Sequence, residues 1–115
     1  MAKKEQNRID EETAGKIQNL QILEQNLQNL LMQKQAFSFE SAETVNALSE
    51  LKASEGEVFK IVGSIMIKAE KKELEKDLIK KKDLLELRIK NINKQEESLK
   101  QKLLEMKEEV INKIN

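Results

Sequence analysis

The chain contains no cysteine, histidine, proline, tryptophan or tyrosine, and it has only three glycines and three phenylalanines among 115 residues. Without cysteine there can be no disulfide, no thiol nucleophile and no thiolate metal ligand. Without histidine the chain lacks the side chain most often used for proton transfer near neutral pH. Because aromatic residues are so few, the buried surface should be a thin aliphatic seam and not a thick hydrophobic core.

The sequence also lacks an excess of charge of either sign and any long apolar run. Charged residues make up 37% of the chain, but 21 basic and 21 acidic side chains balance to a net charge of zero. A chain without net charge has no long-range field to attract nucleic acid or anionic lipid, so neither nucleic acid nor a membrane is expected as a partner. Even the longest apolar runs, such as Ile65–Ile67, are far shorter than the roughly 20 residues of a membrane span. These features predict a soluble, cytoplasmic protein.

What the sequence does contain is a heptad pattern in its first half. Lys and Glu accompanied by Leu, Ile and Gln are typical of coiled coils. Two rows of period seven can be followed: Leu20, Leu27, Lys34, Ser41 and Leu48, and Leu23, Leu30, Phe37, Thr44 and Leu51. The rows are offset by three and four residues, which places them on one helical face. The pattern predicts a helix over about residues 7–53, with a seam weakened in its middle by the polar members.

The second half carries a more regular pattern. One row consists of Leu78, Leu85, Ile92, Leu99 and Met106, and the next contains Ile89, Leu103 and Val110, interrupted by Lys82 and Glu96. The predicted helix, over residues 70–114, extends about 65 Å at 1.5 Å per residue. Nothing else in so short a chain can cover a helix of this length. We therefore expect a mainly α fold, a long antiparallel two-helix coiled coil that forms a single domain over residues 1–115.

The segment between the helices, residues 57–68, changes to the period of a β-strand. Gly63 at the first position of a Gly63–Ser64 loop favours a type II′ turn. This loop pairs Val62 with Ile65, Ile61 with Met66, Lys60 with Ile67 and Phe59 with Lys68. Both faces of the hairpin are then largely apolar and both edges are unpaired, so it should recruit strands from other chains, with local packing on the helix ends as the alternative. The residues expected to mediate oligomerisation are Val58, Phe59, Ile61, Val62, Gly63, Ile65, Met66 and Ile67.

No constellation of residues in the sequence suggests catalysis. There is no glycine-rich phosphate loop and no nucleophile beside a base, and the carboxylates occupy exposed helix positions without a loop to complete a metal site. The lysines at 80–82 alternate with acidic neighbours, which is typical of a solvated face. We therefore assign no catalytic residue, no metal and no cofactor, and we expect the protein not to be an enzyme.

The helix–hairpin–helix pattern closely resembles the β-type subunit of archaeal prefoldin, nearly from end to end. The resemblance is most specific at Val58–Lys68, and it continues in Leu84–Ile89 and Lys94–Glu97 of the second helix. It implies a hexamer of two α-type and four β-type subunits, in which the hairpins join into inter-subunit β-barrels and the coiled coils project as tentacles. It also implies an ATP-independent holding chaperone that binds unfolded client proteins at the tentacle tips and delivers them to a group II chaperonin.

The tip of the coiled coil, where the chain ends meet, is the surface on which the resemblance places client binding. The residues expected there are Ile17, Leu20, Met106, Val110, Ile111 and Ile114. Adaptable apolar side chains in several copies suit a binder of unfolded chains. The rival interpretation is a structural coiled-coil scaffold or adaptor that binds one folded partner. Client range separates the two, because a chaperone protects several unrelated unfolded proteins.

Overall fold

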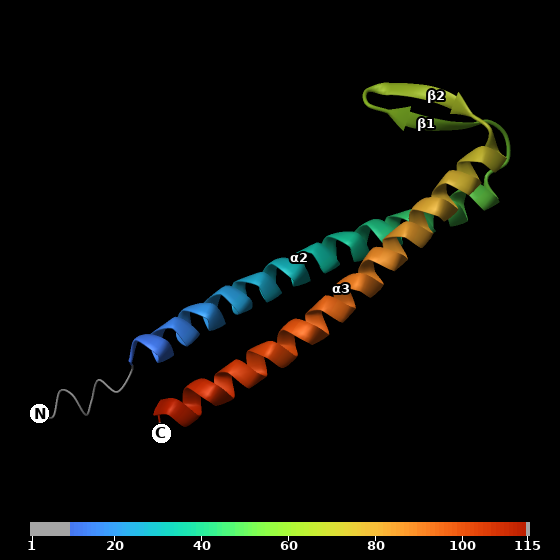
Figure 1. The fold of residues 1–115 in the computed structure, drawn as a ribbon. Helices are drawn as coiled ribbons and strands as arrows, with labels where there is room; N and C mark the ends of the chain where they lie inside the picture. The colour runs from blue at the N-terminus through green and yellow to red at the C-terminus, as the bar shows by residue number, and fades with distance from the viewer. Residues whose placement is uncertain (1–9, 115) are drawn as a thin grey trace, which may run out of the picture. The chain divides into compact units, whose positions relative to one another are not determined.

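The computed structural model describes residues 10–114, and it contains two long helices joined by an antiparallel β-hairpin (Figure 1). The elements are α2 (Glu11–Ala53), β1 (Val58–Val62), β2 (Ile65–Ala69) and α3 (Lys71–Ile114). This is the expected fold class. The predicted start of the first helix at about residue 7 lies outside the described residues. Within them the chain divides into two compact units, residues 10–33 with 92–114, and residues 34–91.

Helix α2 begins where a side chain caps its free backbone amides. Asp10 Oδ1 accepts a hydrogen bond of 2.7 Å from the backbone N–H of Thr13, and the Asp10 carbonyl accepts one of 2.9 Å from Ala14. An aspartate in this position satisfies one of the orphan donors of the first turn. The helix therefore begins at Glu11, directly after its cap.

The C-terminal end of α2 is held by the first residue of α3. Lys71 Nζ donates hydrogen bonds of 2.9 Å to the Ser54 carbonyl and 3.3 Å to the Lys52 carbonyl. A cation at this position satisfies carbonyls that the helix leaves unpaired and complements the negative end of the helix dipole. Gly56 follows with a φ of 97°, a conformation that favours glycine, and the chain turns into β1.

The burial of side chains confirms the two heptad rows in each helix. Every one of these row positions is buried or half-buried, including the polar members of the pattern. The buried apolar members are Leu30 and Ile92 in the first unit and Leu48, Leu51 and Leu85 in the second. Thr44, a polar seam residue, is 3% exposed, and its hydroxyl donates a 2.8 Å hydrogen bond to the Glu40 carbonyl. A buried hydroxyl with a partner costs little, so the seam tolerates it.

Cross-helix contacts show that the two helices are antiparallel within each unit. In the first unit Lys16 Nζ lies 3.2 Å from Glu109 Oε2, and Lys107 Nζ lies 3.9 Å from Glu24 Oε1. Residues later in the sequence of α2 thus face residues earlier in the sequence of α3, as expected for antiparallel helices.

The second unit has the same helix direction. Lys81 Nζ lies 3.9 Å from Glu40 Oε1, and the guanidinium of Arg88 lies 5.5 Å from the centroid of the Phe37 ring. Here too a later residue of α2 faces an earlier residue of α3. The two helix segments of the second unit are therefore antiparallel.

The hairpin has the predicted register. Val62 pairs with Ile65, Ile61 with Met66, Lys60 with Ile67 and Phe59 with Lys68, and Val58 with Ala69 extends the ladder by one pair. Gly63 has a φ of 61°, while no other residue type among those described has a positive φ. A type I′ turn would require positive φ at both loop residues, so this loop is consistent with the type II′ turn that the sequence predicts.

Candidate functional site

An apolar groove lies in the first unit, near the start of α2 and the end of α3. It has a volume of about 360 Å³, and its lining consists of Asn19, Ile22, Leu23, Lys102, Glu105, Met106 and Glu109. Ile22 is 57% exposed, whereas Leu23 and Met106 are half-buried. The groove therefore presents an aliphatic and thioether surface bordered by polar and charged side chains. Methionine adapts to irregular partners because its side chain is unbranched and flexible.

The structure brings one of the six predicted tip residues, Met106, into the lining of this groove. Of the others, Ile17, Leu20 and Val110 are half-buried, and Ile111 and Ile114 are exposed. The sequence analysis missed Ile22, which lies outside both heptad rows. Its signal was an apolar residue between the two seam positions Leu20 and Leu23, where a coiled coil normally carries a polar side chain.

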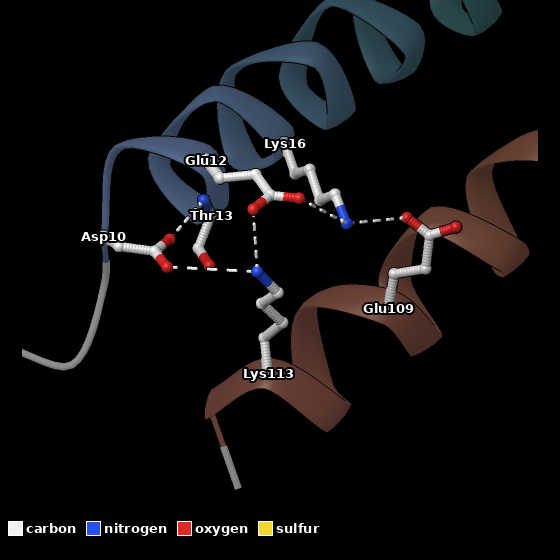
Figure 2. Close-up of polar contacts among 6 residues, drawn as sticks. All are labelled: Asp10, Glu12, Thr13, Lys16, Glu109 and Lys113. Atoms are coloured by element: carbon white, nitrogen blue, oxygen red, sulfur yellow. Dashed lines mark hydrogen bonds and ion pairs between the residues drawn. The ribbon is translucent and has the colours of Figure 1, made fainter.

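A cluster of ion pairs joins the start of α2 to the end of α3 (Figure 2). Lys113 Nζ lies 3.0 Å from Glu12 Oε2 and 3.9 Å from Asp10 Oδ2. Lys16 Nζ lies 3.8 Å from Glu12 Oε1 and 3.2 Å from Glu109 Oε2. Because Glu109 also lines the groove, the cluster and the groove share one residue. We call these five residues the end clamp.

Three groups of the end clamp have shifted pKa values. Hydrogen bonds from the backbone and side chain of Thr13 lower the pKa of Asp10. The hydrogen bond from Lys113 lowers the pKa of Glu12, and the same bond raises the pKa of Lys113. Each shift favours the charged form, so these groups are ionised around neutral pH.

The hairpin in the second unit exposes apolar side chains on both faces. Strand alternation places Val62, Ile65 and Ile67 with Lys60 on one face, and Phe59, Ile61 and Met66 with Lys68 on the other. The six apolar residues are between 42% and 72% exposed, and Val58 at the root is half-buried. Fully burying such a side chain contributes about 1.5–3 kcal/mol. A two-stranded sheet with this surface is expected to be covered by another chain.

The described residues offer neither a metal site nor a membrane-spanning helix. Across residues 10–114 no group of three or more acidic side chains is placed to hold a metal ion. Neither α2 nor α3, as far as the structure describes them, is apolar enough over a sufficient length to cross a membrane. The groove and the hairpin are two candidate binding surfaces among the described residues.

The fold is that of a coiled-coil protein with one exposed apolar surface on its hairpin and another near its helix ends. The sequence model of the prefoldin subunit family matches residues 14–115. The chain therefore belongs to the prefoldin subunit family, whose members are chaperone components and not enzymes, and work within an oligomer.

Individual relatives agree with this assignment. The chain is 35% identical over 98 residues to prefoldin subunit beta of Archaeoglobus fulgidus, a match that covers 84% of each chain. It is 30% identical over 105 residues to prefoldin subunit beta of Saccharolobus islandicus, covering 90% of this chain and 83% of the relative. The crystal structure of the prefoldin beta subunit from Thermococcus strain KS-1 superposes with a TM-score of 0.84 at 28% identity, covering 93% of this chain and 96% of the other.

Proposed function

We propose that this chain is a β-type subunit of a holding chaperone that binds unfolded proteins without ATP and delivers them to a group II chaperonin. The observation that carries the proposal is the groove near the helix ends, in which Ile22 is more than half exposed beside Leu23 and Met106. A solvent-exposed apolar groove suits the short apolar stretches that unfolded chains display.

Weak binding at each groove is sufficient for this function. Several subunits that engage one client raise the effective concentration of the remaining contacts, and each weak contact still permits release. We expect the five other predicted tip residues to add apolar surface for a client: Ile17, Leu20, Val110, Ile111 and Ile114. The charged outer surface keeps the helices in solution without trapping the client.

Assembly in the proposal uses the hairpin. Its apolar residues on both faces support pairing with strands of other subunits in an inter-subunit β-barrel, in a hexamer of two α-type and four β-type chains. Native mass measured after co-expression with an archaeal α-type subunit tests this step. A discrete mixed hexamer is expected, and a chain indifferent to the α-type partner would contradict it.

The groove is tested by a matched pair of substitutions. Ile22→Asp places a charge in the groove, whereas Leu104→Asp changes a side chain of similar exposure, 54%, that does not line it. We expect Ile22→Asp alone to reduce suppression of aggregation of several unrelated unfolded clients, because a charge in an apolar contact must be desolvated. Equal loss in both variants, or protection of one folded partner only, would favour the scaffold interpretation.

A further inference from the structure

The α2 segment of the first unit differs from the rest of the chain in its charge. Of the seventeen residues 17–33 only Glu24 is charged, although charged residues make up 37% of the whole chain. Eight of the seventeen are glutamine or asparagine. The α3 segment of the same unit, residues 92–114, has ten charged residues among 23. The lack of charge is therefore a local property of α2 and not of the coiled coil as a whole.

The outward side of this segment has no charged residue. Glu24 lies beside α3, because its Oε1 atom is 3.9 Å from Lys107 Nζ. Six exposed residues follow one another at spacings of three or four, which keeps them on one side of the helix. We call them the amide face, and they are Gln18, Ile22, Gln25, Asn29, Met32 and Gln33.

Two exposed apolar side chains lie on the amide face. Ile22 is 57% exposed and Met32 is 68% exposed. Ile22 also lines the groove, so the groove and the amide face are continuous. The two residues are ten positions apart, about 15 Å along the helix. An extended polypeptide spans this distance with about four or five residues, so one segment can reach both side chains.

The amide groups between these apolar residues can form further hydrogen bonds. Gln25 Nε2 donates a hydrogen bond of 3.2 Å to Asn29 Oδ1. Among residues 10–114 the Gln25 carbonyl oxygen and the Asn29 amino group have no hydrogen-bond partner. A primary amide carries both a donor and an acceptor, as a peptide group does. The amide face can therefore pair with the N–H and C=O groups that an extended chain leaves unpaired.

The lack of charge lowers the cost of covering this surface. When another polypeptide covers an amide, hydrogen bonds to water are exchanged for hydrogen bonds to peptide groups. Covering a lysine or glutamate would instead remove a full charge from water, at a much larger cost. A chaperone surface that must accept many sequences also gains from neutrality, because a neutral surface does not select clients by their charge.

We propose that the amide face binds the backbone of an extended, unfolded client, whose apolar side chains contact Ile22 and Met32. The proposal rests on the proposed function, because the groove and the amide face hold the same client. It extends the client contact along α2, and it assigns to the glutamine and asparagine side chains the ability to bind acidic and basic clients alike.

Two synthetic unfolded peptides test the proposal with the full chain assembled with an α-type subunit. They share one apolar pattern and differ only in carrying glutamates or lysines between the apolar residues. Fluorescence anisotropy of the labelled peptides should give affinities for the parent protein that agree within about threefold. Gln18→Glu/Gln25→Glu adds two carboxylates to the amide face and keeps side-chain size and helix propensity. We expect this variant to bind the glutamate peptide at least about tenfold more weakly, relative to the lysine peptide.

The matched control adds the same charges to α3. Asn93→Asp/Gln95→Glu changes two exposed residues of the same unit, and the ratio of the two affinities should stay within about threefold of the parent value. Circular dichroism and native mass check that the variants fold and assemble. An equal change of the ratio in both variants would overturn the proposal. A shift of native mass in Gln18→Glu/Gln25→Glu would place the amide face against another subunit and would also overturn it.

A second pair of variants separates the amide face from the groove. Met32→Ala and Leu104→Ala each truncate an exposed apolar side chain that does not line the groove. We expect Met32→Ala to weaken binding of both peptides about three- to tenfold, and Leu104→Ala to change it less than about twofold. If Ile22→Asp abolished binding while Met32→Ala and Gln18→Glu/Gln25→Glu had no effect, the client would be confined to the groove. The amide-face proposal would then fail and the proposed function would stand, whereas unchanged binding in Ile22→Asp as well would overturn both.

Discussion

Replacing Ile61 and Ile65 by aspartate should dissociate the proposed hexamer into its subunits while leaving each subunit folded. The two residues lie on opposite faces of the hairpin, so the double variant places a charge on each face. They are 72% and 62% exposed in the single chain, so neither contributes much to its internal packing. The helices should therefore remain intact.

The expected magnitude follows from the burial that assembly would provide. Each isoleucine that loses full burial forfeits about 1.5–3 kcal/mol, and each carboxylate adds a desolvation cost. A combined loss of at least about 4 kcal/mol corresponds to association weakened about a thousandfold. At micromolar concentration this change should convert assembled protein into free chains.

Native mass spectrometry or light scattering of the double variant, co-expressed with an α-type subunit, measures the outcome. Val45→Asp is the matched control, because Val45 is an exposed aliphatic residue of α2 in the same unit, away from the hairpin. The single variants show which hairpin face is buried more fully. An unchanged assembly in the double variant would refute the β-barrel reasoning.

Three further predictions concern the helices. Deleting the chain from Val110 onward should reduce suppression of client aggregation by at least about half with assembly intact, and full protection by the truncated protein would contradict the tip assignment. Leu85→Ala, at a position only 2% exposed, should lower the free energy of unfolding in urea by about 2–5 kcal/mol. Acid should weaken the end clamp, because the lowered pKa values of Asp10 and Glu12 make their stabilisation present above their ordinary values of 3.8 and 4.5 and lost as the pH falls below them. The raised pKa of Lys113 makes its contribution present below its ordinary value of 10.5 and lost as the pH rises above it. Protection of the helix-end amides against exchange, measured relative to the intrinsic exchange rate at each pH, should therefore be greatest between these limits.

Most of the fold could be predicted because it depends on local periodicity. The heptad rows identify Leu48 and Leu85 as seam residues, since a helix of this length needs one continuous apolar face. The hairpin register follows from the position of Gly63, because a two-residue loop determines every pair after it. Neither inference requires knowledge of the distance between helices.

The candidate site depends on the relation between helices, which periodicity does not supply. Met106 was predicted as an apolar residue near the chain end, but the groove also requires Ile22, whose neighbours come from the other helix. The end clamp escaped prediction for the same reason, because Lys113 and Glu12 are 101 residues apart in sequence.

The distribution of apolar residues suggests why stability, assembly and client binding can be altered separately. Leu85 and Leu48 are buried in the seam and stabilise the single chain, whereas Ile61 and Ile22 remain exposed after the chain has folded. An exposed apolar side chain contributes little to folding, but its burial by a second molecule contributes to binding. A substitution at Ile61 should therefore change the assembled fraction, and one at Ile22 the affinity for clients, with little effect of either on the unfolding of the subunit. If both variants instead lowered unfolding stability as much as Leu85→Ala does, these surfaces would be part of the fold and not interfaces.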